Sequence, residues 1–233
     1  HLGVDVRDAF LLAIEQSGRE DIEVLVQDDA RKPDLARNLA NEFMQRDDGD
    51  ILPGIIGANL AMAVVPSVVR QGTFYLSPNA GPSDLAGRMC HENYFNVAYQ
   101  NDNLHGAMGA WMREQGYENP IIMAPNYPAG TDALAGFKHL YEGEVADELY
   151  TQMGQTDYAA EIAQIRASDA DSLFFFLPGG MGISFMKQWQ NAGVEMPVFG
   201  AAFSFDEILI KAVGEAAIGA RNTSLWAYDL DNA

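Results

Sequence analysis

The sequence has few of the residues on which several common kinds of site depend. It contains one cysteine, Cys90, in 233 residues. An intrachain disulfide is therefore excluded, and so are zinc sites built from paired cysteines. A lone thiol most often packs as a small apolar side chain, so we expect Cys90 to be buried. The histidines at positions 91, 105 and 139 show no spacing typical of metal ligands, and we expect them to be packed or solvated rather than metal-bound.

Basic residues and long apolar runs are also scarce. Lysine and arginine total 14 against 33 acidic residues, a formal net charge of −19. A chain this acidic has no general attraction for nucleic acid or for anionic lipid, and no local basic patch suggests a polyanionic substrate. No apolar run approaches the roughly 18 residues that a membrane-spanning helix needs. The chain opens at His1 without a signal-peptide pattern, so we expect a processed chain or a fragment.

What the sequence does contain is a regular alternation of short apolar runs with amphipathic helical stretches. Near-continuous apolar strands that alternate with helices are typical of a parallel sheet covered on both faces, so we predict an α/β fold. The predicted strands are 22–26, 51–56, 74–76, 94–98, 120–124, 145–150, 173–177 and 197–199, and the predicted helices are 4–17, 32–46, 59–70, 103–115, 131–141, 157–167, 182–192 and 206–213. We also expect Asn59 to cap the helix that it begins.

Two polar interruptions of this pattern indicate where the chain divides. One is the run 100–103, between a strand and a helix, and the other is the stretch 222–233. We predict a first lobe at 1–100, a second lobe at 101–222 and a crossing back toward the first lobe at 223–233. The alternative is one sheet with a polar loop.

The residues that follow the predicted strands indicate binding rather than catalysis. Ligands of open parallel sheets bind beyond the carboxyl ends of the strands. The segments at these ends are 57–59, 77–83, 125–130, 178–182 and 200–204. They hold small, hydroxyl-bearing and amide-bearing residues, with no histidine, lysine or carboxylate pair, so we predict no catalytic residue and no metal site. Small residues before helix N-termini suit a passively bound carboxylate.

The glycine-rich segment 179–182 is the one feature that favours an enzyme. A Rossmann or flavodoxin-like oxidoreductase would need the complete dinucleotide fingerprint at this segment. The third glycine would fall at position 185, which is Phe185, and no acidic residue takes the ribose-binding role. We therefore predict neither an enzyme nor a cofactor.

Four segments resemble a known family. They are 6–15, 77–83, 124–130 and 199–204, and they resemble the type I periplasmic binding proteins of the leucine/isoleucine/valine-binding group. This resemblance implies two Rossmann-like parallel-sheet lobes with a hinge and a ligand cleft between them. It implies a periplasmic, monomeric solute receptor that delivers a small molecule to the permease of an ABC transporter. Family members begin with a further strand and return to the first lobe after the second crossing, so the resemblance also implies a fragment with an incomplete N-terminal lobe.

The resemblance also bears on the ligand. Amino-acid-binding members place an acidic residue where this chain has Ala202, followed by Phe203. A buried ammonium group without a partner is costly, so an aromatic carboxylate of the benzoate or hydroxycinnamate type fits better. Branched-chain or other aliphatic amino acids remain an alternative, as does the ligand-sensing domain of a regulator.

We expect the ligand-binding residues at the strand ends of both lobes. The ligand carboxylate would lie against the backbone amides of Ala80 and Gly81 and the helix start at Asn59, and its ring would lie between Tyr127 and Phe203. The predicted ligand-binding residues are Asn59, Ser77, Asn79, Ala80, Gly81 and Gln100 in the first lobe, and Tyr127, Gly179 and Phe203 in the second.

Overall fold

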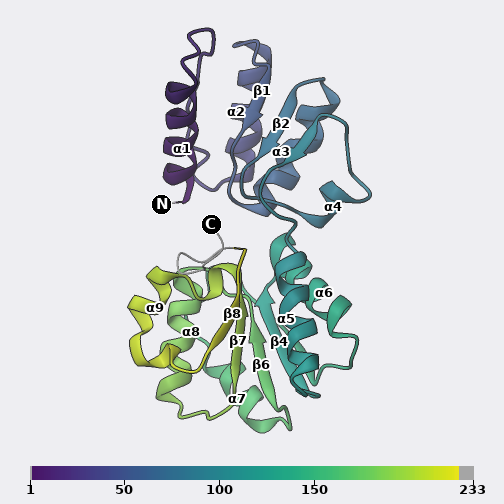
Figure 1. The fold of residues 1–233 in the computed structure, drawn as a ribbon, viewed down its shortest axis with the longest axis vertical. Helices are drawn as coiled ribbons and strands as arrows, with labels where there is room; N and C mark the ends of the chain where they lie inside the picture. Colours follow the sequence, from purple (N-terminus) through teal and green to yellow (C-terminus); the bar gives the residue numbers. More distant parts are fainter. Residues whose placement is uncertain (1, 226–233) are drawn as a thin grey trace. The chain divides into compact units, whose positions relative to one another are not determined.

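The computed structural model describes residues 2–225 and divides the chain into two compact units. The N-terminal unit is His1–Gln100 and the C-terminal unit is Asn101–Ala233. Each unit contains its own parallel sheet, which confirms the predicted α/β fold with two parallel sheets (Figure 1). Most of the predicted second crossing, from position 226 onward, lies outside the described residues. No helix among residues 2–225 is long and apolar enough to cross a membrane.

The C-terminal unit contains a five-stranded sheet in the order β5-β4-β6-β7-β8, with all neighbouring strands parallel. Strands β4 and β6 are buried along their whole length, which explains why their sequences are continuous apolar runs. The strands are β4 Pro120–Pro125, β5 Asp147–Thr151, β6 Ser172–Phe175, β7 Val198–Ala201 and β8 Arg221–Thr223. The helices are α5 Asn103–Glu114, α6 Pro128–Tyr141, α7 Ala159–Ala167, α8 Gly180–Asn191 and α9 Glu207–Val213, with 3-10 turns η1 Ala202–Ser204 and η2 Gly214–Ala217.

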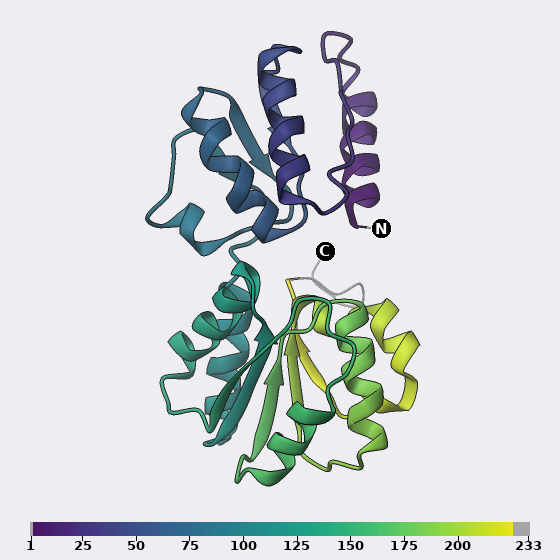
Figure 2. The ribbon, with the colours of Figure 1, turned by 180° about the vertical axis from the view of Figure 1, so that it is seen from behind.

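Helices cover both faces of this sheet (Figures 1 and 2). On one face Phe137 of α6 stacks on Phe174 of β6, with ring centroids 4.5 Å apart. On the other face Phe185 of α8 packs against Phe175 of β6, with centroids 5.0 Å apart. Buried aromatic pairs of this kind contribute about 0.5–1.5 kcal/mol beyond the area that they bury. The alternation of side chains along β6 thus builds two cores from consecutive phenylalanines.

The N-terminal unit contains a three-stranded parallel sheet in the order β1-β2-β3. Its strands are β1 Ile51–Pro53, β2 Phe74–Ser77 and β3 Tyr94–Asn96, and its helices are α1 Leu2–Ser17, α2 Pro33–Gln45, α3 Ala58–Arg70 and α4 Ser83–Ala86. Helices α2 and α3 lie on one face of this sheet (Figure 2) and bury Tyr75 of β2 in a core with Ala40, Val64 and Val68. Helix α1 buries no residue.

The opposite face of the N-terminal sheet is apolar and exposed. Ile51 pairs with Phe74, and Leu76 pairs with Phe95, so these side chains share one face. The exposed fractions are 53% for Ile51, 46% for Phe74 and 48% for Phe95. Among the described residues, helices therefore cover only one face of this sheet.

Two predicted strands differ most from the structure, and the bounds of the others differ by one or two residues. Segment 22–26 forms no strand, because no neighbouring strand among the described residues offers it backbone partners. Most of its apolar residues are exposed, including Leu25 at 46% and Val26 at 51%. Strand β1 ends at Pro53 rather than 56, because Gly54 and Ile55 adopt positive φ angles of 119° and 64° that extended strands exclude.

Three further differences concern local signals. Helix α3 begins at Ala58 with Gly57 as its N-cap, so Asn59 lies in the first turn and does not cap it. Cys90 is exposed, not buried as expected, because it lies in the turn between α4 and β3. Strand β8, with the sequence Arg-Asn-Thr, carried no apolar signal and is defined by its pairing with β7.

Candidate functional site

The last residue of β2 and the loop after it carry four of the predicted ligand-binding residues, and side chains of β2 and β3 hold this loop in place. Ser77 is fully buried, and its hydroxyl donates to the carbonyl oxygen of Ala80. The hydroxyl of Tyr94 on β3 also donates to this oxygen, at 3.5 Å. The bond from Ser77 fixes the turn at Ala80, with Tyr94 as a longer second contact, so Ser77 shapes the loop from inside the unit.

Asn79 and Gly81 tie this loop to the segments after the two neighbouring strands. The side-chain amide of Asn79 donates to the carbonyl oxygen of Ile56 at 3.0 Å, in the loop before α3. A β-carbon added to Gly81 would lie 1.9 Å from the carbonyl oxygen of Tyr99, so only glycine fits. Gln100 follows Tyr99 directly. The structure therefore gathers the segments of Asn59, Asn79, Gly81 and Gln100 at the carboxyl end of the N-terminal sheet.

The start of α3 supplies an electrostatic feature at the same end. Leu60 and Ala61 donate their backbone amides to the carbonyl of Gly57. The amides of Ala58 and Asn59 precede them and, by helix geometry, have no acceptor within the helix. These amides and the helix dipole favour a carboxylate. Asn59 is half-buried.

In the C-terminal unit, Tyr127 lies at the junction of β4 and α6. It is the N-cap residue of α6, and its backbone amide donates to the carbonyl oxygen of Pro125 at 2.9 Å. Its side chain is half-buried. Gly130 packs so closely on this turn that an added β-carbon would lie 1.9 Å from the same Pro125 oxygen. The position of the Tyr127 ring thus depends on a tightly packed turn.

Gly179 and Phe203 lie at the ends of β6 and β7. Gly179 is the N-cap of α8 with a positive φ of 64°, a conformation that glycine adopts without strain. Phe203 is half-buried in η1. Its neighbour Ser204 is fully buried and joins the two strand ends: its hydroxyl donates to the carbonyl of Phe175 at 3.2 Å and accepts from the amide of Leu177 at 3.3 Å.

Two buried polar residues of this unit lie near its strand ends: His105, expected to be packed or solvated, is packed, and Thr151 was not anticipated. His105, in the first turn of α5, is 3% exposed and packs against Phe174 and Phe176, with ring centroids 5.9 and 4.7 Å away. Burial lowers the pKa of His105 to about 3, so its ring is neutral. Thr151, at the end of β5, is also 3% exposed. No periodic pattern distinguishes such residues, because their burial depends on tertiary packing.

The chemistry of these strand ends suits binding. Among the described residues, no group of three or more histidine, cysteine, aspartate or glutamate side chains could hold a metal ion. One carboxylate, Asp132, lies in the first turns of α6. It accepts a hydrogen bond from the side-chain amide of Asn101 at 3.0 Å. The strand ends offer backbone amides, hydroxyls and aromatic rings.

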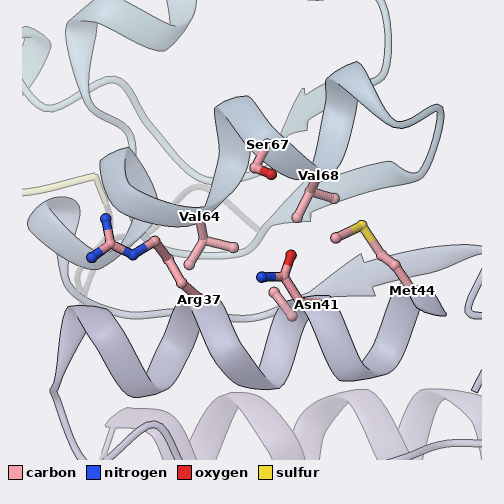
Figure 3. Close-up of a pocket in the computed structure, with 7 residues that line it drawn as sticks. Arg37, Asn41, Met44, Val64, Ser67 and Val68 are labelled. Carbon is pink, nitrogen blue, oxygen red and sulfur yellow. The ribbon is translucent and has the colours of Figure 1, made fainter. Parts of the chain in front are cut away.

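Two hollows lie elsewhere, on the helix layers. One lies between α2 and α3 (Figure 3) and encloses about 200 Å³ of empty space, part of it open to solvent. A larger one, about 610 Å³ and also partly open, lies between α7 and α8. The first is lined by Arg37, Ala40, Asn41, Met44, Val64, Ser67 and Val68, and the second by Ala159, Ile162, Ala163, Arg166, Gln188, Asn191 and Ala192. Neither includes a predicted ligand-binding residue.

The chain is similar in sequence to curated proteins. It is 24% identical over 224 residues to the Leu/Ile/Val-binding protein homolog 6 of Brucella melitensis biotype 1. This match covers 92% of the chain and 57% of the Brucella protein. The chain therefore spans little more than half the length of this relative.

Two solved structures are similar in both sequence and fold. One is a solute-binding protein of an ABC transporter from R. palustris in complex with benzoate, with 26% identity and a TM-score of 0.86 over 94% of this chain and 63% of that one. The other is a solute-binding protein from Rhodopseudomonas palustris BisB5 in complex with 3,4-dihydroxybenzoic acid, with 26% identity and a TM-score of 0.83 over 94% and 62%. None of these three proteins is named as an enzyme. A sequence profile described as periplasmic binding protein matches residues 1–233, so the chain belongs to the periplasmic binding protein family.

Proposed function

We propose that this chain is the ligand-binding part of a solute receptor that captures a small carboxylate outside the cytoplasm and presents it to an ABC transporter permease. The observation that carries the proposal is the composition of the strand ends: helix starts, backbone amides and half-buried aromatic rings lie there without a catalytic set. The residues proposed to bind the ligand come from both units, and the receptor acts as a monomer.

An aromatic carboxylate is the ligand class that these residues favour. The start of α3 and the fixed turn at Ala80 bind the carboxylate in the N-terminal unit. Tyr127 and Phe203 supply flat apolar surfaces in the C-terminal unit. Two similar proteins were solved with benzoate and 3,4-dihydroxybenzoic acid, which supports this class.

A branched-chain amino acid is the second candidate ligand. The Leu/Ile/Val-binding name of the Brucella relative favours it. The residue at position 202 argues against it, because an alanine there offers no charge to an ammonium group. Calorimetric titrations with benzoate, 4-hydroxybenzoate, leucine and valine decide between the two. Tight binding of leucine or valine with no response to either acid would contradict the aromatic ligand.

Replacing Phe203 by alanine should weaken the binding of benzoate by more than about tenfold. The ring contributes a large apolar contact surface, and a tenfold change corresponds to about 1.4 kcal/mol of binding free energy. The binding constant is measured by calorimetry, and thermal unfolding shows whether the fold is kept.

The matched control is Phe95→Ala, which removes an exposed phenylalanine from β3 on the apolar face of the N-terminal sheet. This change should leave benzoate binding within about twofold of the wild type. Equal losses in both variants, or no loss in Phe203→Ala, would remove Phe203 from the site.

A further inference from the structure

The hydroxyl of Thr151 is an unusual group in the C-terminal unit. Its side chain is 3% exposed, and its Oγ1 has no hydrogen-bond partner among the residues that the structure describes. The buried hydroxyls of Ser172 and Ser204 in the same unit both have partners, at Asp171 and Phe175. A buried hydroxyl without a partner destabilises a protein, so its presence calls for a role.

The strand itself does not need this hydroxyl. Thr151 takes part in the sheet through its backbone, whose carbonyl accepts from the amide of Asn126 at 2.9 Å. Leu149, two residues earlier and on the same side of the strand, packs against the hydrophobic core. Valine has the shape of threonine, fits a strand equally well and has no polar group to bury. A threonine at this position is therefore not explained by folding.

The position of Thr151 connects it to the proposed ligand site. Thr151 is the last residue of β5 and pairs with Pro125 of β4. Pro125 lies two residues before Tyr127 in the sequence. After β5 the chain turns back, and the amide of Gly154 lies 3.3 Å from Sδ of Met181, two residues after Gly179. The loop after β4 thus contacts Thr151 itself, and the first turn of α8 contacts the turn that follows Thr151. The chain continues from Thr151 into an exposed turn at 152–154, in which Gly154 has a positive φ of 81°.

We propose that Thr151 is a specificity-determining residue whose hydroxyl, buried and without a partner among the described residues, lies beside the loop that carries Tyr127 and bonds to a ring hydroxyl of the ligand. The inference rests on the proposed function. Within the C-terminal unit, the proposed ligand contacts Tyr127 and Gly179 belong to the segments that lie nearest to Thr151 and to the turn after it. A threonine hydroxyl donates one hydrogen bond and accepts others, which matches a neutral phenolic hydroxyl.

The test compares hydroxylated with unsubstituted acids. Thr151→Val should weaken the binding of 3-hydroxybenzoate or 4-hydroxybenzoate by about tenfold and leave benzoate within about twofold, because only the hydroxylated acid loses a partner. The melting temperature should stay equal or rise, because valine removes an unpaired polar group from the interior. The same titrations are run on Thr223→Val, whose hydroxyl donates to the carbonyl of Leu104 at 2.8 Å. This control should lose stability and keep the wild-type ratio of the two affinities.

The outcomes separate this inference from the proposed function. If the wild type binds benzoate and Thr151→Val leaves the ratio of hydroxybenzoate to benzoate affinity unchanged, the role of Thr151 is wrong. The proposed function then stays in place. Wild-type protein that binds none of these acids overturns the aromatic ligand and this inference with it. A loss confined to the hydroxylated acids supports both.

Discussion

Replacing Gly130 by alanine should destabilise the C-terminal unit by about 2 kcal/mol. The new β-carbon would lie 1.9 Å from the carbonyl oxygen of Pro125, which the amide of Tyr127 already holds in place. Relieving such an overlap by backbone movement costs about 1–3 kcal/mol. The higher helix propensity of alanine offsets up to about 1 kcal/mol. Urea unfolding followed by tryptophan fluorescence measures the change, because Trp111 and Trp189 lie in α5 and α8 of this unit.

Gly180→Ala is the matched control for this prediction. Gly180 also lies at the start of a helix that follows a strand of the same sheet, but its added β-carbon meets no atom within 4 Å. This variant should be as stable as the wild type or slightly more so. If the two variants unfold at the same urea concentration, the turn at Gly130 is not tightly packed and the placement of Tyr127 is wrong.

The sequence predicted the C-terminal unit better than the N-terminal unit for a physical reason. Strands β4 and β6 are buried on both faces, and the resulting apolar runs stand out from the flanking helices. Segment 22–26 has a similar composition, but a strand also needs backbone partners, and composition does not reveal whether a neighbour exists. Strand β8 has neither an apolar run nor an alternation and forms through its pairing with β7.

The candidate site could be predicted by position but not in detail. Tyr127, Gly179 and Phe203 follow apolar runs in the sequence, and each lies just after a strand of the C-terminal sheet. Ser77 and Asn79 stabilise their loop by donating hydrogen bonds to carbonyl groups that lie 3 and 23 residues away in the sequence. The sequence does not reveal these partners. The burial of Thr151 and His105 likewise depends on helices and loops that pack onto the sheet from distant parts of the chain.

The buried ring of His105 makes the C-terminal unit sensitive to acid. Burial between Phe174 and Phe176 lowers the pKa of this histidine to about 3, well below the value of about 6.5 expected in an unfolded chain. Between these two values the unfolded state takes up a proton and the folded state does not. The free energy of unfolding therefore falls as the pH falls through this window, by about 1.4 kcal/mol per pH unit.

Lowering the pH from 7 to 5 should remove about 2 kcal/mol of stability through His105 alone. The His105→Leu variant should lose less stability than the wild type over this interval, whatever its stability at pH 7, because leucine takes up no proton. Urea unfolding at each half pH unit gives both slopes, and carboxylates such as Glu148 beside Lys138 contribute equally to each. The control is His139→Gln, which changes an exposed histidine of α6 and should keep the wild-type slope. Parallel curves for wild type and His105→Leu would mean that the folded protein accommodates a charged ring at position 105, and His105 would then not be held in a closed apolar site.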